Sequence, residues 1–252
     1  MGLAEFFLMA AALLLASTLQ AATGFGLAIL AVPVLFVLVS STIVVPVIAA
    51  LSFLVSLVLI PGLWSLASRR SLYHLAGGSC LGFPVGLGAF MYGSLDELKL
   101  VSGIVVTTFA GILILSEWRG SEDTGTFANT PLPAVEWGVG AVSGAMATAL
   151  AMPGPAIMIY LMFRRAPKHI ARAITLSLFG LSYAVATGLH VLYGGLTVSF
   201  WWTVAALTPA VLLGTGAGHV LARLIPEDRF RRAVIMLLVL SGLSAVLAAI
   251  YG

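Results

Sequence analysis

The chain has 252 residues, of which 61% are hydrophobic and only 8% charged, and its formal net charge is +3. An average soluble domain carries about 25% charged residues, so this composition excludes a soluble globular protein and indicates an integral membrane protein. The single cysteine, Cys80, excludes an intrachain disulfide and a cysteine cluster that binds metal, and the basic residues lie beside hydrophobic segments instead of forming a nucleic-acid-binding domain.

Eight hydrophobic segments occupy nearly the whole chain, and about 20 apolar residues suffice for one helix to cross a bilayer. They lie at 4–39, 43–64, 72–92, 98–117, 134–163, 170–192, 198–222 and 230–251. All five tryptophans lie at or near the segment ends, where aromatic rings prefer the lipid headgroup region. The N-terminal run has Glu5 in place of a basic region, so we interpret it as a membrane segment and not as a cleaved signal. We predict an all-α polytopic membrane protein.

The first segment is too long for one upright helix and too short for two complete spans. We predict a re-entrant or broken helix with its tip near Thr23–Gly26, where Gly24 and Gly26 permit a tight turn, followed by a hinge or kink at Pro33. Non-helical backbone at membrane depth must be buried in protein or line a cavity, so this tip is a candidate binding site.

The fifth segment repeats this pattern, because Gly144 precedes Pro153 by the same nine residues that separate Gly24 from Pro33. We predict a second broken helix across 144–155, with a single kinked span as the alternative. The chain then divides into a first membrane repeat at 1–116, a midpoint linker at 117–133 and a second membrane repeat at 134–252, with four hydrophobic segments in each repeat. Pro84 and Pro209, each among glycines, support the duplication more weakly.

The distribution of Lys and Arg favours the re-entrant arrangement. If both long segments are simple spans, the 12 basic residues divide 9 to 3 between the two sides of the membrane. If both are re-entrant, the repeats are inverted and the division becomes 11 to 1, with Lys99 alone outside. Both arrangements place the termini outside and the loops 164–172 and 223–232 in the cytoplasm. The two arrangements place the loops 66–71 and 116–133 on opposite sides of the membrane.

The stretch 20–33, QAATGFGLAILAVP, followed by Val45-Pro46, resembles the opening signature of the TauE/SafE family of sulfite and organosulfonate transporters. Residues 152–155, MPGP, and 172–175, RAIT, repeat it loosely, although alanines stand at 145, 147 and 149 where the family commonly has glycines. The resemblance implies a transporter of the bacterial inner membrane for a small sulfur anion: sulfite, thiosulfate, a sulfonate or a carboxylate analogue.

A dehydrated anion at the bilayer midplane needs compensating partners, because an unpaired charge there costs several kcal/mol. We therefore expect helix N-termini, restarting near Gly26 and after Gly154, to hold the anion between the repeats. The other residues predicted to contact or shape the substrate site are Gln20, Thr23, Gly24, Phe25, Ser143, Gly144, Thr148, Pro153 and Arg172.

Each assignment has a structural alternative. The glycines also suit close helix packing, which is our interpretation of Gly82, Gly86, Gly214 and Gly218. The polar side chains also suit bonds to neighbouring helices, Phe25 suits core packing, and Pro33 and Pro153 suit simple kinks. Arg172 either attracts anions or extends its charge toward lipid phosphates. His190 and His219 are interpreted as interfacial.

The sequence disfavours other classes of function. The histidines are scattered and no carboxylate lies in the middle of a segment, which argues against an intramembrane enzyme and a carboxylate proton relay. No nucleotide-binding motif is present, and we predict no catalytic residue, metal or cofactor. A carboxylate transporter, an anion channel and a non-transporting structural or receptor protein stay as alternatives, and the glycine-rich faces are compatible with a homodimer.

Overall fold

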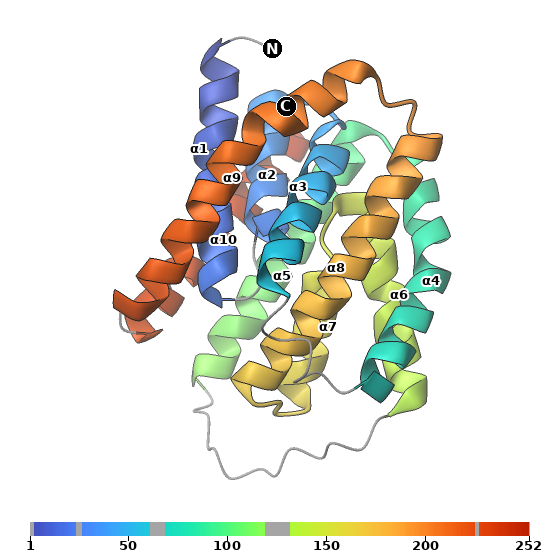
Figure 1. The fold of residues 1–252 in the computed structure, drawn as a ribbon, viewed down its shortest axis with the longest axis vertical. Coiled ribbons are helices and arrows are strands. Elements are labelled where there is room, and N and C mark those ends of the chain that lie inside the picture. Colours follow the sequence, from blue (N-terminus) through green and yellow to red (C-terminus); the bar gives the residue numbers. More distant parts are fainter. Residues whose placement is uncertain (1–2, 24–26, 61–68, 119–131, 225–226, 252) are drawn as a thin grey trace.

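The computed structural model describes residues 3–23, 27–60, 69–118, 132–224 and 227–251, and all regular structure in these ranges is helical (Figure 1). The helices are α1 Leu3–Thr23, α2 Leu27–Val39, α3 Val44–Leu59, α4 Arg69–Tyr92, α5 Leu95–Trp118, α6 Pro133–Leu150, α7 Gly154–Phe163, α8 Lys168–Tyr193, α9 Val198–Leu224 and α10 Glu227–Tyr251. Among the described residues, six helices are long and apolar enough to cross a membrane: α1, α4, α5, α8, α9 and α10. The predicted polytopic α-helical membrane protein is confirmed.

The first and fifth predicted segments are each broken into two helices, as expected. The first break separates α1 from α2, and the second separates α6 from α7. Figure 1 shows the chain turning back at each break, so that α2 packs beside α1 and α7 beside α6. The start of α1 and the end of α10 lie at one end of the molecule, and the loop between α7 and α8 lies at the other.

The second break lies at 151–153, within the predicted range 144–155, but Gly144 does not form it. Gly144 lies inside α6, which continues to Leu150, and Ala151 then ends the helix in a left-handed conformation with φ of 54°. Prolines at 153 and 155 follow, and proline prevents a helix from continuing through the preceding turn. Pro33, by contrast, lies inside α2. The equal Gly-to-Pro spacings therefore do not mark equivalent positions, and that part of the repeat alignment was wrong.

The long helices pack in pairs: α4 with α6, α1 with α9, α5 with α10, and α3 with α8. In the first pair, Gly82 lies directly against the backbone of Ala141 and Ala145. In the second, Gly214 lies against Leu14 and Ser17. Small residues let helix backbones approach closely where lipid supplies no hydrophobic driving force. The packing interpretation of the glycines is thus confirmed, and it applies equally to Gly86 and Gly218.

Gly82→Ala should destabilise the fold, because the added methyl group would clash with the backbone of α6. We expect a loss of about 1–3 kcal/mol, measured as a lower thermal midpoint of the purified protein in detergent. Gly88→Ala is the matched control, since a Cβ on Gly88 meets nothing within 4 Å. Equal midpoints for the two variants would contradict the packing.

Candidate functional site

The first turns of α2 and α7, the helices that follow the two breaks, meet inside the protein. A Cβ built on Gly154, the first residue of α7, would lie 3.4 Å from Cδ1 of Ile29 in the first turn of α2 and 3.0 Å from Cζ of Phe179 in α8. Segments more than 120 residues apart in sequence are therefore in contact at their N-terminal turns. The junction of α2 and α7, held against α8, is the centre of the candidate site.

Both N-terminal turns at this junction are buried. Residues 27–33 of α2 and 152–155 around the start of α7 are shielded from solvent. The N-cap of α7, Pro153, makes no side-chain capping bond. The first N–H groups of a helix have no partner within the helix and carry about half a positive charge. Two such ends facing one buried region form a site suited to an anion.

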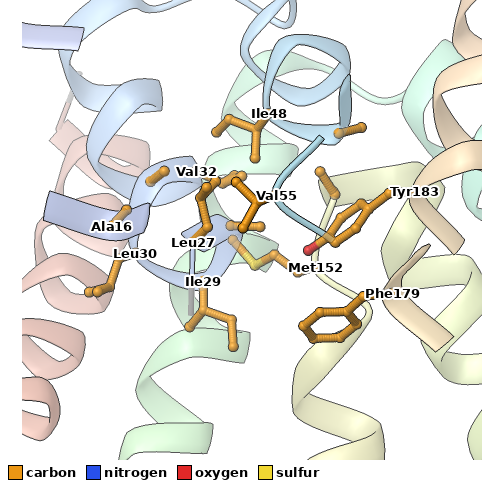
Figure 2. Close-up of a cluster of buried hydrophobic side chains, with 14 of the residues drawn as sticks. Ala16, Leu27, Ile29, Leu30, Val32, Ile48, Val55, Met152, Phe179 and Tyr183 are labelled. Carbon is orange, nitrogen blue, oxygen red and sulfur yellow. The ribbon is translucent and has the colours of Figure 1, made fainter. Parts of the chain in front are cut away.

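The walls around the junction are apolar. Figure 2 shows side chains from α2, α3, α8 and the second break gathered in one cluster, including those of Leu27, Ile29, Val55, Met152, Phe179 and Tyr183. An apolar surrounding strengthens electrostatic attraction, because it holds little water to screen charge. It also rejects any anion whose charge is left without donors.

Gln20 is the most informative polar residue at the first break. It lies in the last turn of α1, it is 0% exposed, and neither its Nε2 nor its Oε1 has a hydrogen-bond partner among the described residues. Leaving a buried polar group unpaired costs about 1–3 kcal/mol, so proteins rarely do this without a reason. The unpartnered amide of Gln20 is therefore a candidate ligand-binding group.

Arg172 connects α8 to the end of α1. Its Nη2 donates a 2.8 Å hydrogen bond to the carbonyl oxygen of Ala21, and its Nε has no partner among the described residues. A cation at a helix C-terminus compensates the negative end of the helix dipole. Arg172 thus holds the end of α1 at the break, a role that sequence could not show because Ala21 is 151 positions away.

Three predicted residues of α6 make contacts within the protein. Ser143 Oγ donates to the carbonyl oxygen of Pro153 at 2.9 Å, and Thr148 Oγ1 donates to that of Phe83 on α4 at 2.9 Å. Gly144 packs against the backbone of Ser79. The two hydroxyl protons are therefore committed to bonds that fix the second break and join α6 to α4. These contacts support the structural alternative for all three residues.

The remaining predicted residues divide into two groups. Pro153 and Gly154 lie at the second break, where they were expected. Gly24, Phe25 and Gly26 lie outside the described residues, as does the side chain of Thr23. Their assignment to the ligand stays a prediction.

Sequence analysis missed a buried ionisable cluster at the opposite end of α7. Glu136, in the first turn of α6, is 1% exposed and contacts His74 and Tyr160. In sequence, a lone carboxylate beside Trp137 resembles an interfacial charge, so no local pattern indicated the cluster. His190 was also misjudged: it is 0% exposed and packs edge-on against Phe90, so it is not interfacial.

The described residues include no group of three or more His, Cys, Asp or Glu side chains that could hold a metal ion. The polar groups at the junction are backbone amides, one amide side chain and one guanidinium. The N–H groups of such residues donate hydrogen bonds to oxyanions.

Comparison with known families identifies the chain. The family model described as sulfite exporter TauE/SafE matches residues 9–245, nearly the whole length. The chain belongs to this family. No curated protein and no solved structure matched. TauE/SafE is a transporter family, so the chain is a multi-pass membrane transporter and not an enzyme.

Arg172→Met should destabilise the protein by about 1–3 kcal/mol, because the Ala21 carbonyl loses its charged donor. Thermal unfolding in detergent measures this effect. Arg165→Met, at an exposed position just after α7, removes the same charge and should leave the midpoint nearly unchanged. If both variants behave alike, Arg172 does not hold the break.

Proposed function

We propose that this transporter is a secondary carrier of a small sulfur-containing anion, a sulfonate, sulfite or thiosulfate, across the bacterial inner membrane. The observation that carries the proposal is the buried and unpartnered amide of Gln20 in the last turn of α1, at the first helix break. The second break ends at Gly154, where α7 begins in contact with α2. The family match supports the sulfur chemistry.

The geometry of the junction suits an oxyanion of this kind. Two helix N-termini supply roughly half a positive charge each, which together offset about one negative charge. Sulfite and sulfonate groups present three oxygens, each of which accepts hydrogen bonds from backbone N–H groups approaching from different directions. The Nε2 of Gln20 supplies a further donor, and the apolar wall of Phe179 and Ile29 limits the size of the anion.

We further propose that residues 1–116 and 134–252 are inverted repeats joined by the linker 117–133. The packing supports this, because the largest helix contacts have counterparts when α1–α5 are matched in order to α6–α10: α1 with α9 matches α6 with α4, and α2 with α3 matches α7 with α8. The pairs α5 with α10 and α3 with α8 each join corresponding helices of the two halves, so each pair is its own counterpart. With α1–α2 and α6–α7 as hairpins, the crossing helices are α3, α4 and α5 in the first half and α8, α9 and α10 in the second. Of these, α3 is the shortest, with 16 residues. An odd number of crossings reverses the orientation of the second half.

Inverted repeats explain how access alternates between the two sides. Rocking one repeat against the other exposes a fixed central site first to one compartment and then to the other. With both termini periplasmic, 11 of the 12 basic residues face the cytoplasm, as the positive-inside rule favours. A homodimer stays a prediction that no contact in the structure tests.

Gln20→Met should raise the thermal midpoint of the ligand-free protein and weaken anion binding. Methionine matches glutamine in volume but removes buried polar atoms that have no partner, which relieves a cost of about 1–3 kcal/mol. The measurement is a thermal-shift titration in detergent with sulfite, thiosulfate, isethionate and sulfoacetate, each compared with a matched carboxylate. A ligand of the native state raises the midpoint by mass action.

Thr18→Val is the control, because the hydroxyl of Thr18 is satisfied within α1 by the carbonyl of Leu14 at 2.7 Å. We expect this variant to keep the shift that a sulfur anion produces in the unsubstituted protein. Two results would refute the proposed site and substrate: no shift with any sulfur anion, or an unchanged shift in Gln20→Met. A shift with carboxylates alone would favour the carboxylate alternative.

Cysteine labelling tests the orientation. On a Cys80→Ala background, Ser121→Cys in the linker should resist an impermeant maleimide added to intact cells and react after permeabilisation. Thr197→Cys, between α8 and α9, should react from outside. External labelling of Ser121→Cys would contradict the inverted arrangement.

A further inference from the structure

The cluster around Glu136 joins three helices at one end of the α6–α7 hairpin. Glu136 Oε2 lies 2.7 Å from Nδ1 of His74 on α4, and Oε1 accepts a 2.9 Å hydrogen bond from the hydroxyl of Tyr160 on α7. An ionised carboxylate only accepts hydrogen bonds, so Nδ1 of His74 carries the shared proton when Glu136 is charged. Both carboxylate oxygens are then occupied.

The side chains of the cluster differ in their exposure to solvent. The side chain of Glu136 is 1% exposed, whereas that of His74 is 20% exposed. Tyr160 is buried as well. An imidazole has two nitrogens, either of which can carry a proton. His74 can therefore take a proton from solvent on Nε2 and deliver the proton on Nδ1 to Glu136, which solvent does not reach directly.

A purely structural role explains this composition poorly. Removing a carboxylate from water costs several kcal/mol, and a neutral amide in the same place could bond both partners without that cost. Buried ionisable residues in membrane proteins commonly mark sites where protons bind and leave. The helix dipole of α6 favours a negative charge in its first turn, but this accounts for neither the burial nor the histidine.

The cluster is mechanically linked to the proposed anion site. Tyr160 belongs to α7, a helix of only ten residues, whose other end is Gly154 at the junction of the two breaks. A rigid helix of this length spans about 15 Å. Protonation of Glu136 removes the charge that Tyr160 and His74 bind, so it loosens the hold on one end of α7 and frees the other end to move.

Other ionisable groups at this end of the molecule contribute to the electrostatic potential around the cluster. Arg164, after α7, acts electrostatically on the Tyr160 phenol. The helix α3 contributes no ionisable side chain, and the side chains of Glu117 and Lys168 are outside the described set. The other ionisable side chains here are Arg69, Arg70 and Tyr73 on α4, Arg165 after α7, and His169 and Arg172 on α8.

We propose that Glu136, His74 and Tyr160 form a proton-binding site that couples proton movement to anion transport. One proton enters on Nε2 of His74 from one compartment while the Nδ1 proton passes to Glu136, and after the repeats have rocked one proton leaves through His74 to the other compartment. No other bond forms or breaks. This inference rests on the proposed function, since coupling requires a transported anion.

The test uses the full-length protein in liposomes that enclose a pH-sensitive dye. Thiosulfate, isethionate and sulfoacetate are added separately, because these anions stay ionised near neutral pH and carry no exchangeable proton of their own. Anion counterflow and the change in internal pH are recorded together. In the unsubstituted protein we expect counterflow with at least one anion and, under a gradient of that anion, a pH change that a proton carrier abolishes.

Glu136→Gln should lower the anion-driven proton flux at least tenfold while counterflow falls less than threefold, because glutamine keeps the hydrogen-bonding shape but binds no proton. His74→Gln should show the same split. Glu97→Gln is the matched control: Glu97 is exposed and caps the start of α5 by accepting from the Ser94 amide at 2.7 Å, which glutamine can also do. We expect it to match the unsubstituted protein in both readouts.

Several results would overturn the inference. Counterflow without proton flux in the unsubstituted protein would refute coupling and leave the proposed transport function standing. Proton flux retained in Glu136→Gln would refute the site. Equal loss of counterflow and proton flux in both variants would make the cluster merely structural. Absence of counterflow with every sulfur anion would refute the proposed function and, with it, the coupling.

Discussion

The structure depends on one constraint: a helix interrupted inside a bilayer exposes backbone groups that lipid cannot satisfy. This chain interrupts two helices, and the first turns of the helices that follow, α2 and α7, are buried against each other and against α8. The C-terminal end of α1 receives the guanidinium of Arg172, and the second break is fixed by Ser143. The N-terminus of α7 receives no side-chain cap at Pro153, and the buried amide of Gln20 has no partner among the described residues. The donors left over are those an oxyanion would use.

The rest of the fold separates what must be rigid from what must move. Glycines bring the backbones of paired helices into contact, so α4 with α6 and α1 with α9 form closely packed pairs. The short helices α2 and α7 carry the site and are held by fewer polar bonds. The cluster of Glu136, His74 and Tyr160 attaches α7 to α6 and α4. In the mechanism that we propose, anion binding at one end of α7 and proton binding near the other are connected through this single short helix.

Much of the fold could be predicted from sequence, because hydrophobic length and tryptophan position are local signals. The first break was predicted from the excess length of the opening segment. The second lies within the predicted range 144–155, where Ala151 and the prolines that follow set its position, whereas Gly144 serves helix packing. Repeated spacing alone does not distinguish a glycine that permits a turn from one that permits close approach.

The site was less predictable, because its polar contacts join distant segments. Arg172 reads as a topology signal until its bond to Ala21 is seen, and Ser143 and Thr148 read as free donors until their carbonyl partners are known. Glu136 and His190 lie near segment ends in sequence, yet both are buried by neighbouring helices. Distance along a span thus indicates depth in the membrane but not exposure to lipid, which tertiary packing decides.

The most direct test of the central claim is to locate a bound anion by anomalous scattering. Crystals grown with selenite, the selenium analogue of sulfite, would reveal the anion by its own signal. The account predicts a peak within hydrogen-bonding distance of the backbone amide of Gly154 or the first turn of α2, close to the Gln20 amide. Ordered selenite found only elsewhere, with Gln20 still unpartnered at a dry junction, would contradict it.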